Sequence, residues 1–289
     1  MKLALGTVQF GMPYGIANRG GQVPHEEAAT ILQMARQHGV KLLDTAVGYG
    51  ESETCLGRIG TEGFDIVTKL VLPHPMHEAP EQWIEAQIRD SLMRLNRQKL
   101  YGVLLHRAEQ LNGPHQAAIV RAFQRLKQAG LVEKFGVSIY APDEIAAVLE
   151  TGVVDLIQAP FNLLDRRLLT TGWLQRLHAA GVEIHVRSVF LQGLLLMSRR
   201  AIPERFARWN PLWDAWHDWL QDHPDQSAAQ VCLGFAHACA EISRIVIGVD
   251  GAEQWRHHLI TYGALDAVTW PDLSCDDEAL INPARWTLL

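Results

Sequence analysis

The chain has 289 residues, of which 48% are hydrophobic, and its formal net charge at pH 7 is -6. This length suits one α/β barrel, and its core is large enough to be stable without disulfides or metals. A mildly acidic chain does not indicate the basic surface that binds nucleic-acid phosphates. No apolar run reaches the roughly 18 residues of a membrane span. The N-terminus starts a strand at once and has no signal-peptide pattern. We therefore expect a soluble, cytoplasmic protein that binds neither nucleic acid nor membrane.

The four cysteines indicate neither a disulfide framework nor a metal site. They form no CxxC pair and have no metal-ligand spacing. Cys232 and Cys239 lie seven residues apart on one face of a predicted helix, where buried, reduced thiols are the usual state. We therefore predict no bound metal.

Apolar runs alternate with amphipathic segments along almost the whole chain. The runs predict strands at 3–6, 41–44, 64–70, 100–106, 133–140, 155–161, 182–190 and 244–249. The amphipathic segments predict helices at 26–39, 52–59, 80–95, 115–130, 142–152, near 166–180, 227–240 and 253–263. Strands that are apolar throughout are typical of a parallel sheet covered on both faces. Eight β/α pairs predict a single (β/α)8 TIM-barrel domain over residues 1–289.

Polar side chains follow three of these apolar runs, at the end of each strand. Asp44 ends LLD, Lys69 ends IVTK and His106 ends VLLH, while Tyr49 lies in the glycine-flanked loop after Asp44. In a parallel barrel the carboxyl ends of the strands meet at one mouth, where active sites lie. The sequence therefore predicts that these four side chains converge.

The chemistry of the four groups is coherent. A free tyrosine has a pKa near ~10, and a neighbouring ammonium lowers it by favouring the phenolate. Lys69 could supply that charge, Asp44 could hold Lys69, and His106 could donate a hydrogen bond to a substrate oxygen. A general acid beside a carbonyl suits hydride delivery to the carbonyl carbon. We therefore predict that Tyr49 is a proton donor.

The distribution of these residues resembles the aldo-keto reductase family, whose members carry an Asp, Tyr, Lys and His tetrad at the same strand ends. The resemblance extends over essentially the whole chain. It includes the segments LGTVQFG, DTAVGYGESE, IVTKL, LLH, GVSIY, QAPFNLLDRR, RSVFLQGLL and IGVDGAEQ.

The resemblance implies reduction of aldehydes or ketones, or the reverse oxidation, by a nicotinamide cofactor that binds without a Rossmann domain. Tyr49 would be the general acid and base, with Asp44, Lys69 and His106 completing the catalytic set. Ser138 and Gln158 would hold the nicotinamide carboxamide. The remaining implied cofactor contacts are Arg187, Ser188, Phe190, Gln192, Gly193, Gly248, Asp250 and Gln254.

Two positions near the implied nicotinamide site depart from the family pattern. Ile139 stands where the family often has an asparagine after the serine, which removes one amide contact. Arg187 stands where the family commonly has an aromatic residue that stacks on the nicotinamide. A guanidinium plane can stack as well. The alternative is an arginine at the barrel rim that pairs with a carboxylate.

The cofactor of the family is most often NADP(H), but Asp250 indicates appreciable use of NAD(H). Family members that prefer NADPH usually place Lys or Arg just after the glycine of strand eight, and this chain has Asp250 there. The carboxylate would repel a 2′-phosphate and could accept hydrogen bonds from the ribose hydroxyls. Asp250 could instead cap the following helix, and the helix N-terminus and Arg256 would favour a phosphate.

Two other functions remain open from the sequence alone. The chain could be a non-catalytic nicotinamide-nucleotide sensor or regulatory protein, although a sensor has no need of the phenol. Lys69 could form a Schiff base, as in barrel aldolases, although pairing with Asp44 would keep it charged. For the reductase we expect a small carbonyl or sugar-derived substrate. Tyr14 is a candidate for its pocket wall. The tryptophans at 209, 213, 216 and 219 lie near helical spacing and predict a helix that packs its aromatic face on the barrel; the alternative is that one of them lines the pocket.

Overall fold

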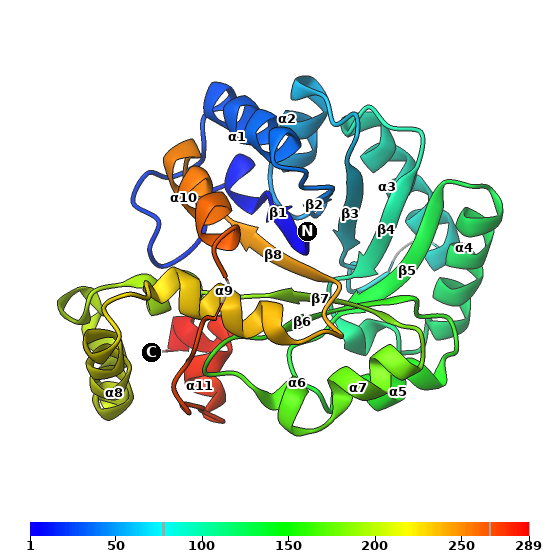
Figure 1. The fold of residues 1–289 in the computed structure, drawn as a ribbon. Helices are drawn as coiled ribbons and strands as arrows, with labels where there is room; N and C mark the ends of the chain where they lie inside the picture. Colours follow the sequence, from blue (N-terminus) through cyan, green and yellow to red (C-terminus); the bar gives the residue numbers. More distant parts are fainter. Residues whose placement is uncertain (77–78, 266, 289) are drawn as a thin grey trace.

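The computed structural model describes residues 1–76, 79–265 and 267–288, and its eight strands form one closed parallel barrel. Each strand pairs with the next in chain order, and the ring closes where Gly6 lies opposite Gly248. Figure 1 shows the strands at the centre with the helices around them. The strands are β1 (Leu3–Gly6), β2 (Leu42–Asp44), β3 (Asp65–Leu70), β4 (Leu100–Leu105), β5 (Val132–Ser138), β6 (Leu156–Pro160), β7 (Glu183–Arg187) and β8 (Arg244–Gly248). The predicted barrel is confirmed.

Helices follow the strands, as the alternating pattern predicts. One difference is that the helix expected near 166–180 is split into two, because Gly172 between them adopts a left-handed conformation (φ 74°). The helices are α1 (His25–Gln37), α2 (Ser52–Ile59), α3 (Pro80–Arg94), α4 (Gln116–Gln128), α5 (Glu144–Glu150), α6 (Arg167–Thr170), α7 (Trp173–Ala179), α8 (Asn210–Asp222), α9 (Ala228–Ala238), α10 (Ala252–Tyr262) and α11 (Glu278–Ile281).

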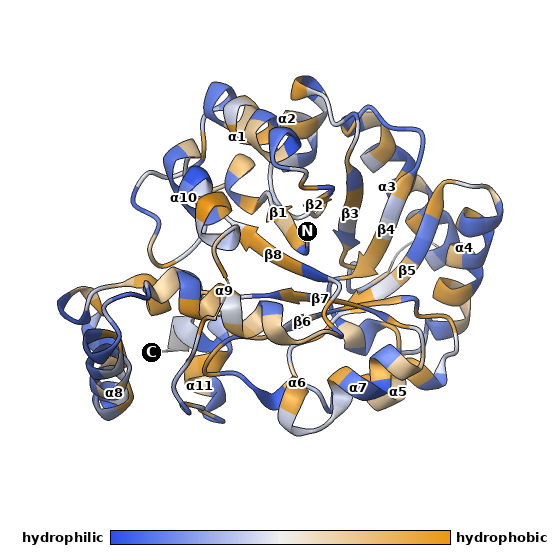
Figure 2. Ribbon diagram, viewed as in Figure 1, coloured by the Kyte–Doolittle hydropathy of each residue, from blue (hydrophilic) through white to orange (hydrophobic). Residues whose placement is uncertain are grey.

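The apolar core has two layers. The larger layer lies between the strands and the helices, and Figure 2 shows hydrophobic residues along the strands and hydrophilic residues on the helices. A small second cluster is separate from that layer and consists of Ala4, Leu42, Val67, Leu104, Leu156 and Val246. Because strand side chains alternate between the two faces, strands β1, β2, β3, β4, β6 and β8 contribute residues to both clusters.

A polar network links β4, β5 and β7. The Glu183 carboxylate accepts hydrogen bonds from the Tyr101 hydroxyl (2.6 Å) and Lys134 Nζ, and it contacts His185 Nε2 (2.8 Å). Burial alone would raise the pKa of Glu183, but these hydrogen bonds outweigh it and lower the pKa. The network therefore satisfies a carboxylate that would otherwise be costly to bury.

The segment between β7 and α9 carries the aromatic helix α8, which stands at one side of the ring in Figure 1. Trp213 and Trp216 are fully buried, and each indole N–H donates to a backbone carbonyl. Trp286, near the C-terminus, packs edge-on against Phe206 at 5.0 Å between ring centroids. These aromatic residues therefore have packing roles. No helix in the described ranges is both long and apolar enough to cross a membrane.

Buried histidine makes stability depend on pH. His258 on α10 is 2% exposed and stacks on Phe190 at 4.8 Å, and neither ring nitrogen has a partner among the described residues. Burial, aided by His257, lowers the pKa of His258 to about 4. An unfolded histidine titrates near ~6.5. Between these values the unfolded chain binds the proton and the folded chain does not, so acid destabilises the fold.

We predict that His258→Leu weakens this pH dependence. Wild type should lose roughly 2–3 kcal/mol of unfolding free energy from this group between pH 6.5 and 4, and the variant should not. Urea denaturation at several pH values measures the difference. The control is His178→Leu, which changes an exposed histidine on α7. If His258→Leu keeps the slope of wild type, the buried imidazole does not resist protonation.

Candidate active site

The barrel brings Asp44, Tyr49 and Lys69 together at the carboxyl ends of its strands. Asp44 ends β2, Lys69 lies one residue before the end of β3, and Tyr49 lies in the turn that leads to α2. Lys69 Nζ is 2.5 Å from Asp44 Oδ1 and 3.4 Å from the Tyr49 hydroxyl, and it also donates to the Thr45 carbonyl at 3.0 Å. The three donors of the ammonium therefore have three acceptors.

The ion pair between Lys69 and Asp44 is buried, since the two residues are 1% and 4% exposed. Burial lowers the pKa of Lys69, and the charge and hydrogen bond of Asp44 oppose that effect. The second oxygen of Asp44 accepts a hydrogen bond from Gln158 Nε2 at 2.7 Å. Asp44 thus has partners on β3 and β6, and it holds the lysine beside the phenol.

Tyr49 is held in its protonated form. Burial raises the pKa of its phenol and the charge on Asp44 adds to the rise, while Arg187 opposes it. The lowered pKa expected from the sequence is therefore wrong, because that expectation counted the ammonium and left out burial. In this structure the phenol keeps its proton at every physiological pH and can act as an acid.

His106 follows β4 and faces Tyr49, with the two rings edge-on at 5.9 Å between centroids. Burial lowers the pKa of His106 to about 4, and the charges of Lys69 and Arg187 add to that effect. The imidazole is therefore neutral at pH 7 and has one N–H to donate. The structure brings together all four residues expected at the mouth.

Glycines seat the Tyr49 loop against the first turn of the chain. Gly50 adopts a left-handed conformation (φ 53°), and a Cβ there would lie 2.4 Å from the Gly11 carbonyl oxygen. A Cβ on Gly11 would lie 1.8 Å from the Tyr49 carbonyl oxygen, whereas one on Gly48 would meet open space. Gly50 and Gly11 are therefore required for this loop, and Gly48 is not.

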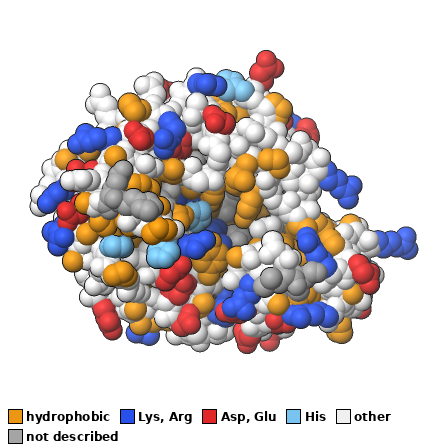
Figure 3. Space-filling model, turned by 180° about the vertical axis from the view of Figure 1, so that it is seen from behind, with side chains coloured by type: hydrophobic (Ala, Val, Ile, Leu, Met, Phe, Trp, Pro, Cys, Tyr) orange, Lys and Arg blue, Asp and Glu red, His pale blue; other side chains and the backbone are white. Residues whose placement is uncertain are grey.

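A cavity opens beside Tyr49. Nine of the ten residues expected to contact a cofactor line it. The tenth, Ser138, lies next to Gln158 across the β5–β6 pairing, and its buried hydroxyl has no partner among the described residues. Figure 3 shows that the face opposite to the view of Figure 1 is hollowed near its centre. The nine lining residues are Gln158, Arg187, Ser188, Phe190, Gln192, Gly193, Gly248, Asp250 and Gln254.

The loop after β7 has an unusual backbone. Ser188, Leu191 and Gln192 have positive φ angles (61°, 48° and 52°), which residues other than glycine rarely adopt. Gly193 also has a positive φ (89°), and a Cβ there would lie 2.5 Å from Ala17 Cβ. Strained backbone of this kind is concentrated at functional sites. The loop forms one wall of the cavity.

The cavity near β8 has amides and a carboxylate. Asp250 Oδ1 accepts from Asn18 Nδ2 at 3.0 Å, and the Asp250 backbone N–H donates to Gln254 Oε1 at 2.7 Å. The first N–H of α10, from Ala252, donates to Glu27 of α1 at 2.6 Å. Glu27 therefore occupies the helix terminus, and the alternative that Asp250 caps α10 is wrong. Arg256, expected to favour a phosphate, does not line the cavity and pairs with Glu253 at 3.0 Å.

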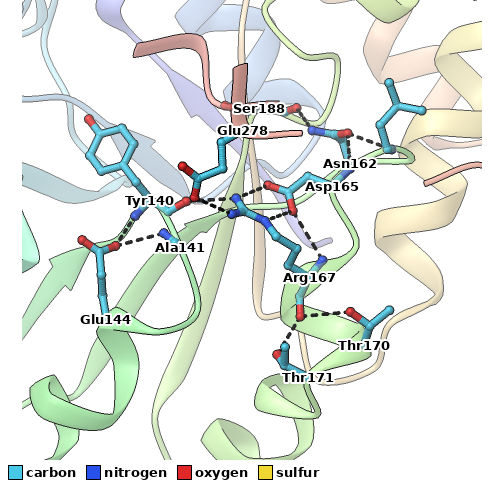
Figure 4. A network of polar contacts seen from close by, with 11 residues as sticks. Tyr140, Ala141, Glu144, Asn162, Asp165, Arg167, Thr170, Thr171, Ser188 and Glu278 are labelled. Carbon is cyan, nitrogen blue, oxygen red and sulfur yellow. Dashed lines mark hydrogen bonds and ion pairs between the residues drawn. The ribbon is translucent and has the colours of Figure 1, made fainter. Parts of the chain in front are cut away.

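A buried network fixes the loops after β5, β6 and β7 (Figure 4). The Arg167 guanidinium pairs with Asp165 at 2.8 Å and with Glu278 of α11 at 3.3 Å, and it donates to the Tyr140 carbonyl at 3.1 Å. Asn162 is fully buried and donates to the Ser188 carbonyl at 3.1 Å. The network therefore connects the loop after β7, which lines the cavity, with the loops after β5 and β6.

Several lining residues fall outside the set expected from the sequence. Gln9 and Asn18 line the cavity from the loop after β1. The segments LGTVQFG and YGIAN contain them, but nothing in those letters shows where their side chains lie. Tyr14, expected as a wall, does line the cavity, and none of the tryptophans does. Among the described residues, no group of three His, Cys, Asp or Glu side chains could hold a metal.

The family model of the Aldo/keto reductase family matches residues 2–263. The chain therefore belongs to the aldo/keto reductase family, and it is an oxidoreductase. It is 24% identical over 252 residues to a protein of Bacillus subtilis named "Uncharacterized oxidoreductase YqkF", with 81% of each chain covered. It is 28% identical over 161 residues to a 6-dehydroglucose reductase of Novosphingobium aromaticivorans, which covers 50% of this chain and 51% of that protein.

Solved structures of the family share the fold at low sequence identity. The aldo-keto reductase AKR11C1 from Bacillus halodurans, in its holo form, has a TM-score of 0.73 at 21% identity, covering 93% of this chain and 88% of that one. The glycerol dehydrogenase AKR11B4 from Gluconobacter oxydans has a TM-score of 0.71 at 20% identity, covering 94% and 88%. At sequence identities of 20–21%, this similarity shows a shared barrel fold.

We predict that Gly50→Ala displaces the Tyr49 loop and Gly48→Ala does not. Gly50→Ala adds a Cβ to a residue with a left-handed backbone conformation and places that Cβ against the Gly11 carbonyl. This should cost roughly 1–3 kcal/mol of unfolding free energy. Oxidoreductase turnover should fall at least about tenfold, because a small misplacement of a group beside the reacting atoms slows a reaction. Urea denaturation and steady-state kinetics measure both effects. Equal behaviour of the two variants would contradict this account of the loop.

Proposed function

We propose that this chain is a nicotinamide-dependent carbonyl reductase in which Tyr49 exchanges a proton with the substrate oxygen. The observation that carries the proposal is the placement of Lys69 Nζ between Asp44 (2.5 Å) and the Tyr49 hydroxyl (3.4 Å) beside an open cavity. Gln158 lines the cavity and already donates its Nε2 to Asp44. Its side-chain oxygen and the neighbouring, unpartnered Ser138 hydroxyl are polar groups that a carboxamide could use. The residues present therefore fit a nicotinamide ring.

Each residue then has a distinct chemical task. When bound, the reduced nicotinamide supplies the hydride. The Tyr49 hydroxyl donates its proton to the carbonyl oxygen, and the Lys69 ammonium stabilises the phenolate that this transfer leaves. Neutral His106 donates a hydrogen bond to the same oxygen and so polarises the carbonyl. Burial keeps the proton on Tyr49, which is the state that reduction requires, but it also makes the phenol a weaker acid. The Lys69 ammonium therefore has to stabilise the phenolate, which both directions of the reaction share.

The same contacts oppose the Schiff-base alternative. An aldolase lysine must be a neutral amine with a free lone pair. Lys69 Nζ has acceptors at Asp44, Thr45 and Tyr49, so it uses all three protons of an ammonium. We propose sugar-derived carbonyl compounds as the substrate class, because one relative is named 6-dehydroglucose reductase and one structural neighbour is named glycerol dehydrogenase. A panel of aldehydes, ketones and oxidised sugars tests that class.

We predict that Tyr49→Phe lowers kcat by ~10²-fold or more, because a general acid contributes about that much. The ring stays in place, so binding of the reduced cofactor, measured by fluorescence, should be retained. The control is Tyr262→Phe, at a phenol that contacts the Lys2 amide (2.9 Å) and is not part of the cavity. A near-normal kcat for Tyr49→Phe would refute the role of the phenol. Absence of turnover by wild type on the whole panel, with cofactor bound, would favour a sensor.

We also propose that NAD(H) is the preferred cofactor. Among the described residues that line the cavity, Arg187 is the only Lys or Arg, and it lies at the end of β7. Near β8 the lining has Asn18, Asp250 and Gln254, which can bind hydroxyl groups but cannot neutralise a phosphate. Glu27 adds a second carboxylate at the α10 terminus. This environment suits a ribose diol and opposes a 2′-phosphate.

We predict that wild type binds NADH at least about tenfold more tightly than NADPH. A carboxylate within ~6 Å of a phosphate costs roughly 1–3 kcal/mol at a surface-like dielectric, which corresponds to about a 5- to 150-fold change in affinity. Asp250→Lys should bring the two affinities together, while Asp250→Asn should have a smaller effect. Fluorescence titration measures all six dissociation constants, for the three proteins with each of the two cofactors. Preference for NADPH in wild type, unaltered by Asp250→Lys, would show that Asp250 does not face the 2′ position.

A further inference from the structure

One positively charged side chain lines the cavity without a carboxylate partner in the residues that the structure describes. Arg187, at the end of β7, lines the cavity together with Asp44 and Tyr49 and is half-buried. Its guanidinium donates to the Ile139 carbonyl at 3.0 Å and to Ser188 Oγ at 3.4 Å. In the described part of the chain no carboxylate forms an ion pair with it. The alternative of a rim arginine paired to a carboxylate is therefore wrong, and most of its five N–H donors remain free.

The structure holds this guanidinium in place. It lies over the Tyr140 ring at 4.7 Å from the centroid. The Tyr140 backbone is fixed on both sides, because its N–H donates to Glu144 at 2.5 Å and its carbonyl accepts from Arg167 at 3.1 Å (Figure 4). Arg187 is therefore a positioned charge and not a freely rotating surface arginine.

Neighbouring groups leave the charge uncompensated. Asp44 is already neutralised by Lys69 at 2.5 Å. His106 is uncharged at pH 7 because its pKa is lowered to about 4, and the phenol of Tyr49 keeps its proton. The charge of Arg187 nonetheless reaches these groups, since it contributes to lowering the pKa of His106 and opposes the rise at Tyr49. This part of the cavity therefore carries a net positive charge.

We propose that Arg187 makes the site distinguish the two redox states of the cofactor, with the oxidised form bound more weakly. The inference rests on the proposed function, because hydride transfer requires the nicotinamide ring close to the carbonyl that Tyr49 protonates. The reduced ring is neutral and the oxidised ring carries a positive charge. At a separation of about 6 Å two like charges repel enough to weaken binding roughly tenfold. The oxidised cofactor that forms when the carbonyl substrate is reduced is thus released readily.

The test measures equilibrium binding without substrate, so it does not depend on turnover. Dissociation constants of NADH and NAD⁺ are measured by calorimetry for wild type, Arg187→Gln, Arg187→Met and Arg187→Lys. The neutral variants should lower the ratio of the NAD⁺ constant to the NADH constant about tenfold, mainly by tightening NAD⁺. Arg187→Lys should keep the ratio of wild type. The control is Arg176→Gln, which removes an arginine stacked on Trp173 of α7, outside the cavity.

The outcomes separate this inference from the proposed function. Equal ratios in wild type and in a folded neutral variant would overturn the role of Arg187 while leaving the reductase proposal intact. Failure of wild type to bind any nicotinamide nucleotide, NADPH and NADP⁺ included, would refute both. Two neutral variants of different shape are used because either one could disturb the contact with Tyr140. A ratio that falls in Arg187→Lys as much as in Arg187→Gln would also contradict the proposal, because the effect would then come from shape and not from charge.

Discussion

A buried ammonium sets the geometry of this barrel mouth. Lys69 Nζ is almost inaccessible to water, and a charge in that position is tolerated only with a counter-ion and filled hydrogen bonds. Asp44 supplies the counter-ion, and Gln158 then satisfies the second carboxylate oxygen. Strands β2, β3 and β6 are therefore linked through one set of polar contacts. The phenol of Tyr49 lies where the remaining proton of the ammonium can reach it.

The barrel and the convergence of the four candidate residues could be predicted because both depend on local patterns and one topological rule. Apolar runs of strand length, alternating with amphipathic segments, define the eight units. Polar residues at the ends of three runs then converge, because all parallel strands end at one mouth. Asp44, Lys69 and His106 were found in this way. Tyr49 was found because a phenol between two glycines has no use in a turn.

The remaining features depend on packing that the sequence does not express. Glu27 lies 225 positions from the helix terminus that it occupies, and no spacing rule connects the two. The direction of the Tyr49 pKa was mispredicted because burial and the charge on Asp44 raise it more than Arg187 lowers it, and burial is known only from the fold. The split of the helix near 166–180 follows from Gly172, but a glycine in a helical pattern is often tolerated. Tertiary context decided each of these features.

The cavity is built from both ends of the chain. Asn18 and Asp250, which are hydrogen-bonded across it, lie 232 positions apart, and Glu27 joins α1 to α10 at the same place. These walls meet only when β8 pairs with β1, which is the contact of longest range in the barrel. Such contacts form late in folding, because closing a long loop costs conformational entropy. During synthesis the chain therefore does not have this cavity until its eighth strand has emerged, and a ligand that binds there stabilises the closed ring over open intermediates.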